Sequence, residues 1–86
     1  MEAFVFVNTK PGLFWSVAEE AERIEGVLNA DAVTGEFDVI VHVEYAEMND
    51  LREITVNLRS LNGVVKTQTL IAMPVTSYDL GDEPHL

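Results

Sequence analysis

The chain has 86 residues, 48% of them hydrophobic, and contains no cysteine. This length and composition predict one small folded domain and exclude disulfides and thiolate metal sites. Fifteen Asp and Glu residues against five Lys and Arg give a net charge of −10. Because nucleic-acid binding depends on clustered Lys and Arg, and the five are scattered here, we expect no direct DNA or RNA binding.

Targeting and membrane signals are absent from the sequence. No apolar run approaches the roughly 18 residues of a membrane span, and the first residues lack the basic region of a signal peptide. We therefore expect a soluble cytoplasmic protein.

The first half of the chain begins with a strand and a helix. Residues 3–8 alternate as a strand, with Phe4 and Phe6 on one face. A helix is predicted over 13–25, with Gly26 as its C-terminal cap. Its apolar stripe consists of Phe14, Val17, Ala18, Ala21 and Ile24.

Two strands follow, over residues 27–34 and 37–44, and a tight turn at Gly35 and Glu36 joins them. Asp38 stands at the head of the second of these strands, which is otherwise strongly apolar. A strand of this kind needs no charge at its start, so Asp38 is a candidate binding residue. The simpler interpretations are that Gly35 serves only the turn, and that Asp38 caps this turn or pairs with Lys66.

The second half repeats the pattern of helix and strand. Asn49 or Asp50 is expected to cap a second helix, with Glu53 completing a capping box and Asn62-Gly63 ending it. Its buried face is Leu51, Ile54, Leu58 and Leu61. Residues 64–73 are predicted as the last strand. We assign 1–75 to the domain and 76–86 to a C-terminal tail.

The order β-α-β-β-α-β predicts an α+β, ferredoxin-like fold with a four-stranded antiparallel sheet and both helices on one face. The other face would carry Ile40 and His42, together with Phe4 and Phe6 or their alternates. No part of the chain remains to cover this second apolar face. A homodimer through the sheets is therefore expected, of the dimeric α+β barrel type.

Two segments carry a resemblance to a known family: Val33-Thr-Gly-Glu-Phe-Asp38 and Leu61-Asn-Gly-Val-Val-Lys-Thr-Gln-Thr69. In this order of elements they resemble the effector-binding domain of Lrp/AsnC transcription regulators, over roughly residues 2–75. Members of that family usually carry an N-terminal helix-turn-helix, whereas here Met1 leads straight into the first strand. The resemblance is thus to the stand-alone form, sometimes called RAM, for regulation of amino-acid metabolism.

The resemblance implies amino-acid binding at a contact between dimers that assemble into larger rings. We expect no cofactor and no metal. Full-length Lrp/AsnC regulators are candidate partners. The implied binding residues are Thr34, Gly35, Glu36, Asp38, Thr67, Gln68 and Thr69. Chemically, Asp38 would meet the ligand's ammonium, backbone N–H groups around Gly35 its carboxylate, and threonine hydroxyls would complete the shell.

An enzymatic function is not expected. The chain lacks a cysteine nucleophile, a paired Ser-His-Asp pattern and a glycine-rich phosphate loop. The alternatives left open are a small cofactor-poor oxygenase or isomerase with His42 as base, and a pure assembly module. His42 is otherwise interpreted as a packed or interface histidine, and Trp15, which lies off the helix stripe, as an interface anchor.

Overall fold

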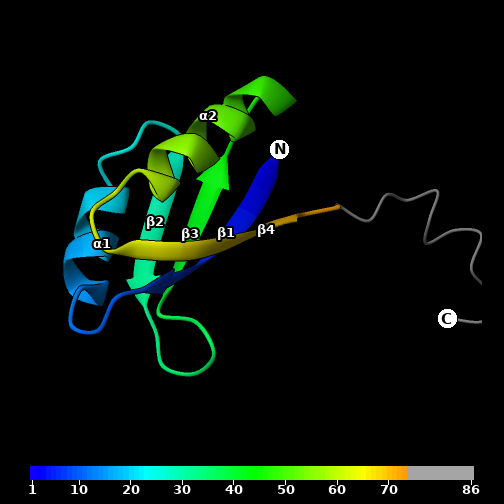
Figure 1. The fold of residues 1–86 in the computed structure, drawn as a ribbon. Helices are drawn as coiled ribbons and strands as arrows, with labels where there is room; N and C mark the ends of the chain where they lie inside the picture. Colours follow the sequence, from blue (N-terminus) through cyan, green and yellow to red (C-terminus); the bar gives the residue numbers. More distant parts are fainter. Residues whose placement is uncertain (74–86) are drawn as a thin grey trace, which may run out of the picture.

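A computed structural model describes residues 1–73, and it confirms the predicted order of elements (Figure 1). The sheet order is β2-β3-β1-β4, and all neighbouring strands are antiparallel. Both helices cover the same face of this sheet. The elements are β1 (Glu2–Thr9), α1 (Phe14–Ala21), β2 (Val27–Ala32), β3 (Val39–Glu44), α2 (Met48–Arg59) and β4 (Val64–Ile71). The ferredoxin-like α+β fold is therefore confirmed.

The core lies between the helices and the inner face of the two central strands. Its strand residues are fully buried, and they alternate along β1 and β3 with residues of the opposite face. The buried set is Ala3, Val5 and Val7 on β1 with Val39, Val41 and Val43 on β3. The helices contribute Val17, Ala18 and Ala21 from α1 and Leu51, Ile54 and Leu58 from α2. The predicted stripes are thus confirmed within α1 and α2, whereas Ile24 and Leu61 lie beyond the helix ends and pack against the core from the connections that follow.

The end of the first helix differs from the prediction. Helix α1 ends at Ala21, with Glu22 as its C-cap, so Gly26 is not the cap. Gly26 has φ +97°, and a Cβ built there would lie 2.6 Å from the Cδ1 atom of Ile54. A glycine is therefore required at position 26 by close packing against α2 as well as by its backbone angle.

The start of helix α2 also differs, and the predicted caps were wrong. Its N-cap is Glu47, which has extended backbone angles, and Asp50 is the third helical residue. The backbone N–H of Glu47 donates to Oδ2 of Asp50 at 3.1 Å. Asp50 therefore takes the place in the capping box that was expected for Glu53. The helix ends at Arg59, with Ser60 as C-cap, before Asn62-Gly63.

The two strands that flank the β2–β3 connection are shorter than expected. β2 ends at Ala32 and β3 starts at Val39, so residues 33–38 form a loop rather than a two-residue turn. β4 ends at Ile71. The predicted tail, residues 76–86, lies outside the described residues, and the 1–75 domain boundary stays a prediction.

Candidate functional site

The 33–38 loop is held against the end of β1 by hydrogen bonds. The N–H of Val33 donates to the carbonyl of Asp38 and closes the loop at 2.9 Å, and the N–H of Asp38 donates to the carbonyl of Val7 at 2.9 Å. The side-chain amide of Asn8 donates to the carbonyl of Glu36 at 2.9 Å. These bonds give the loop a defined position although it lies outside the sheet.

Asp38 has a structural partner, and that partner is a backbone group. Its Oδ2 atom accepts a hydrogen bond from the N–H of Thr9 at 2.8 Å. The alternative pairing with Lys66 is absent from the described residues, where Lys66 lies on β4 opposite Asn8. The other carboxylate oxygen of Asp38 receives no hydrogen bond from residues 1–73. The carboxylate can thus fix the loop with one oxygen and offer the other to a ligand.

Gly35 lies in the middle of this loop with φ +125°, a backbone conformation that residues with a side chain rarely adopt. A Cβ built at Gly35 would have no atom of residues 1–73 within 4 Å. The backbone around Gly35 is therefore open to an approaching group. Thr34, Gly35 and Glu36 are all exposed.

The three predicted residues of β4 do not share one face. β4 pairs with β1 so that Thr67 is opposite Val7, Gln68 opposite Phe6 and Thr69 opposite Val5. Because the valines point into the core, the two threonines lie on the helix side of the sheet, while Gln68 lies on the open side with Phe6. Thr69 accordingly lines a shallow cleft with residues of α2.

One chain does not bring the seven predicted residues together. β1 lies between β4 and β3, so the 33–38 loop and the threonines are separated by two strand spacings, roughly 10 Å. Within a single copy, the loop and Thr67 therefore flank the end of β1 rather than face each other.

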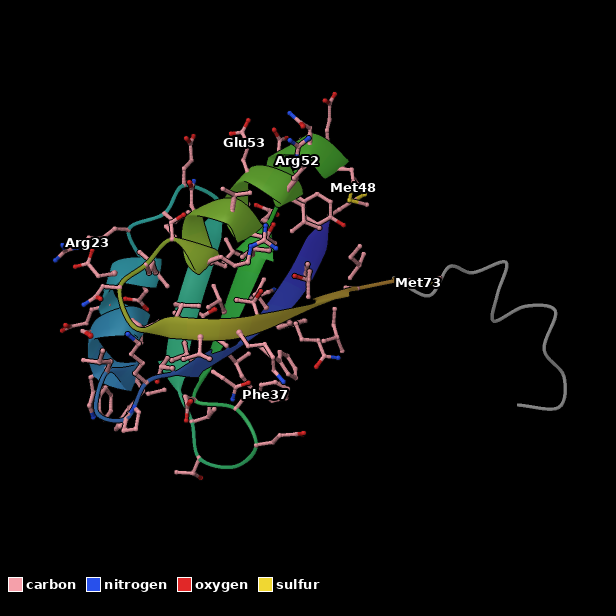
Figure 2. All side chains as sticks on the ribbon, in the orientation of Figure 1. Arg23, Phe37, Met48, Arg52, Glu53 and Met73 are labelled. Carbon is pink, nitrogen blue, oxygen red and sulfur yellow. The ribbon has the colours of Figure 1, made fainter. Side chains whose placement is uncertain are left out.

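The open face of the sheet carries an aromatic cluster. The rings of Phe4 and His42 are stacked at 4.6 Å with an interplanar angle of 8°, and Phe6 meets Phe37 edge to face at 5.1 Å. Phe4 is 38% exposed and Leu70 42%. Figure 2 shows Phe37 on the side of the sheet away from α2, whose outer surface carries Arg52 and Glu53. Since Phe37 belongs to the 33–38 loop, the loop and the open face are in direct contact.

His42 lies in this aromatic cluster. Its Nε2 atom is 2.7 Å from Oε1 of Glu2, and its side chain is 27% exposed. The ring stacks on Phe4 and faces the open side of the sheet. This position agrees with a packed or interface histidine and offers no support for a base in an apolar pocket.

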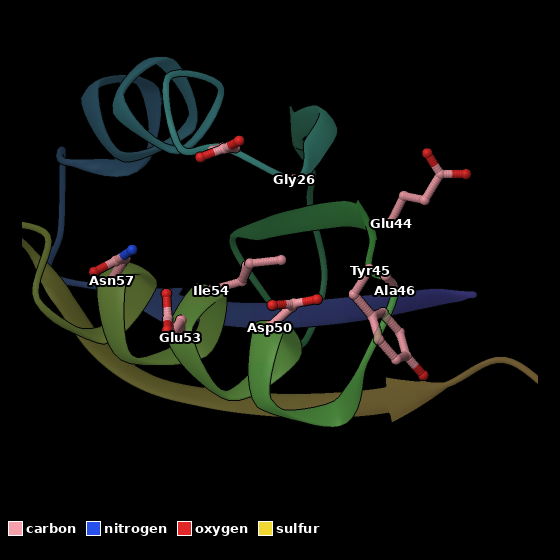
Figure 3. Close-up of a pocket in the computed structure, with 9 residues that line it drawn as sticks. Gly26, Glu44, Tyr45, Ala46, Asp50, Glu53, Ile54 and Asn57 are labelled. Atoms are coloured by element: carbon pink, nitrogen blue, oxygen red, sulfur yellow. The ribbon is translucent and has the colours of Figure 1, made fainter.

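Sequence reasoning missed a cleft on the helix side that is rich in carboxylates. It has a volume of about 360 Å³ and lies between the α1–β2 connection and α2 (Figure 3). Glu25, Glu44, Asp50 and Glu53 line it, and no Lys or Arg does. The signal available in the sequence was the spacing of Asp50, Glu53 and Asn57 along one side of α2. Among residues 1–73, no three His, Asp or Glu side chains are grouped so as to hold a metal ion.

A second cleft, of about 470 Å³, adjoins the 33–38 loop. Its walls are Phe14 and Trp15 from α1, and Ala32, Val33 and Thr34 from the end of β2 and the loop. Trp15, which was predicted to lie off the stripe of the helix, is 66% exposed.

In the described part of the chain, neither helix is long and apolar enough to cross a membrane.

The structure is thus an α+β domain with both helices on one sheet face, an open second face, and the 33–38 loop at its edge. The family model described as "Lrp/AsnC ligand binding domain" matches residues 2–79. The chain belongs to the Lrp/AsnC ligand-binding domain family, as the resemblance predicted.

Solved structures of similar extent share this fold. TTHA0845 from Thermus thermophilus superposes with a TM-score of 0.81 at 26% identity, over 87% of this chain and 95% of that one. The hypothetical protein PHS023 from Pyrococcus horikoshii gives a TM-score of 0.77 at 32% identity, over 90% and 94% of the two chains.

Curated relatives are mainly regulators. The HTH-type transcriptional regulator FL11 of Pyrococcus abyssi is 26% identical over 73 residues, which are 85% of this chain and 48% of that regulator. A homocitrate synthase of Sulfurisphaera tokodaii is 28% identical over 74 residues, 85% of this chain but 16% of the enzyme. The chain thus spans about half or less of the curated relatives that it matches.

Proposed function

We propose that this chain binds an amino-acid effector and forms oligomers, and that it regulates amino-acid metabolism or modulates full-length Lrp/AsnC regulators. The observation that carries the proposal is the geometry of Asp38. Its carboxylate is held at the end of the 33–38 loop by the N–H of Thr9, and one of its oxygens is left for a ligand, while the backbone of Gly35 in the same loop is open. An ammonium group would form a charge-assisted hydrogen bond with that oxygen, contributing roughly 1.5–3 kcal/mol.

A protein of the same fold has been solved with an amino acid bound. The transcriptional regulator NMB0573 from Neisseria meningitidis, which has the same fold with a TM-score of 0.74 at 24% identity, was solved as a complex with L-Met. This likeness concerns the fold alone. The proposal for this chain therefore depends on its own loop.

The open sheet face supports a homodimer. Its aromatic and aliphatic side chains are Phe4, Phe6, Phe37, Ile40 and Leu70, and two of them are more than a third exposed. A second copy that presents the same face would cover this surface with an equivalent one. We propose this pairing as the basic dimer.

A ring of dimers would complete the ligand site. The 33–38 loop and the threonines of β4 flank β1 in one copy, so one chain offers only part of the predicted set. A neighbouring dimer could bring its own loop to Thr67 and Thr69. Ligand binding would then favour the larger assembly, because the ligand contacts two dimers at once.

Direct DNA binding is not part of the proposed function. The net charge of −10 repels phosphate, and the five basic residues are spread over α2, β4 and the connections that flank α1. Any effect on transcription would pass through a DNA-binding partner. We expect this activity in the cytoplasm.

A thermal-shift screen with each amino acid in turn tests the proposal. A ligand present at 100 times its Kd adds about 2.7 kcal/mol to the stability of the folded state, which raises the Tm of a domain this small by roughly 10 °C or more. The matched control for each hit is its analogue without the α-amino group, which should have no effect. If no amino acid raises the Tm, the proposed ligand function is rejected and an assembly module remains as the alternative.

A further inference from the structure

The cleft beside the 33–38 loop is apolar and has two aromatic walls. Its five lining residues among the described part of the chain, Phe14, Trp15, Ala32, Val33 and Thr34, carry no charge, and the cleft is shallow, with a volume of about 470 Å³. Thr34 belongs both to this cleft and to the loop. The cleft therefore begins where the main-chain groups of an amino acid are proposed to bind.

Trp15 is placed in this cleft by α1 and has no packing role of its own in the core. Phe14 packs against the core, whereas the neighbouring Trp15 is 66% exposed. The two rings lie 5.5 Å apart at an interplanar angle of 44°. Across the cleft, the short side chain of Ala32 leaves room above β2. A large aromatic face is thus presented toward space that the protein does not fill.

We propose that this cleft receives the side chain of the effector and selects a large apolar or aromatic one. The inference rests on the proposed function, because the ligand's ammonium and carboxylate must be held at the 33–38 loop. An apolar side chain would displace water from Trp15 and bury both surfaces.

The surroundings of Trp15 disfavour the other classes of side chain. Within the cleft itself, a charged side chain would find no ion-pair partner, and a cationic one would meet carboxylates only in the neighbouring hollow. Trp15 also lines a neighbouring hollow with Glu19, Glu22 and Asp31. These carboxylates would repel an acidic ligand, and a small side chain such as that of alanine would leave the ring uncovered.

The single Trp of the chain gives a direct measurement. The intact protein would be titrated with L-phenylalanine, L-leucine, L-alanine, L-lysine and L-glutamate, following binding by calorimetry and Trp15 by its fluorescence. We expect phenylalanine or leucine to bind at least about tenfold more tightly than alanine, since each buried methylene adds to affinity. Their binding should shift the emission of Trp15 to the blue.

Two variants test the role of the ring. Trp15→Ala should lower the ratio of the Kd for L-alanine to the Kd for L-phenylalanine or L-leucine to below about threefold. The Kd for L-alanine itself should stay unchanged. Trp15→Phe should retain most of the preference. Both variants should keep their melting temperatures, since the side chain is mostly exposed.

Three results would overturn the inference while leaving amino-acid binding intact. These are tighter binding of lysine or glutamate, equal losses for all ligands in Trp15→Ala, and a change in oligomer mass of unliganded Trp15→Ala, which would place Trp15 in a protein interface. If none of the naturally occurring amino acids binds the wild-type chain, the proposed function fails, and this inference fails with it.

Discussion

Replacing Ile40 with Glu places a charge at the centre of the open sheet face. Ile40 lies between Phe6 on β1 and Asp31 on β2, and its side chain is half-buried. In a dimer formed through this face, twofold symmetry would bring two new carboxylates into one apolar interface. Removing each from water costs several kcal/mol, so we expect the dimer Kd to rise by roughly a thousandfold or more.

The fold of the single chain should survive this substitution. The core neighbours Val39 and Val41 point to the other face of the sheet and are untouched. The new charge would lie opposite Asp31, and like charges in this position cost about 0.2–1 kcal/mol. For a domain of this size, that corresponds to a fall in Tm of less than about 8 °C.

Sedimentation equilibrium across micromolar concentrations gives the mass directly. The matched control is Val56→Glu, which adds the same charge on the outer surface of α2, where the side chain is already 43% exposed. The wild type and Val56→Glu should have the dimer mass or a multiple of it, and Ile40→Glu should have the mass of a folded monomer. A folded Ile40→Glu protein with unchanged mass would refute the sheet-face interface.

Two further predictions concern DNA and packing. With duplex DNA at ~100 mM salt, gel-shift and anisotropy titrations should show no binding at micromolar protein, and salt-sensitive binding in this range would contradict the charge argument. Gly63→Ala should lower stability in denaturant unfolding more than Gly12→Ala does. Both glycines have positive φ, but a Cβ at Gly63 would lie 2.9 Å from Cδ1 of Leu13, whereas one at Gly12 meets nothing within 4 Å. Because of this added crowding, we expect the free energy of unfolding of Gly63→Ala to be lower than that of Gly12→Ala by about 1–3 kcal/mol. Equal losses of stability in the two variants would show that Leu13 moves aside freely.

The fold could be predicted because both helices and the two central strands have a clear hydrophobic period. The alternation of β1 separates Val5 and Val7 from Phe4 and Phe6, and these two sets are the buried and open faces of the strand. The ends of the helices and strands were harder to predict. Gly26 has the residue type of a helix cap, but its role depends on its contact with Ile54, which is distant in sequence.

The candidate site could be predicted in part. The 33–38 loop is local in sequence, so its glycine and its aspartate were recognisable. The orientation of Thr67 and Thr69 depends on the register between β4 and β1, and a shift of one residue would reverse it. The apolar cleft likewise joins α1 to the end of β2, and its shape follows from how the helix packs on the sheet.

Calorimetric titration of Asp38→Asn with an amino acid that stabilises the wild type tests the central claim most directly. Asparagine keeps a side-chain oxygen for the N–H of Thr9 but removes the charge, whereas Asp38→Ala removes both. We expect both variants to lose about a hundredfold in affinity, because the ligand's ammonium has no countercharge. Only Asp38→Ala should also lower Tm markedly. Wild-type affinity in folded Asp38→Asn would contradict the proposal that this carboxylate binds the effector.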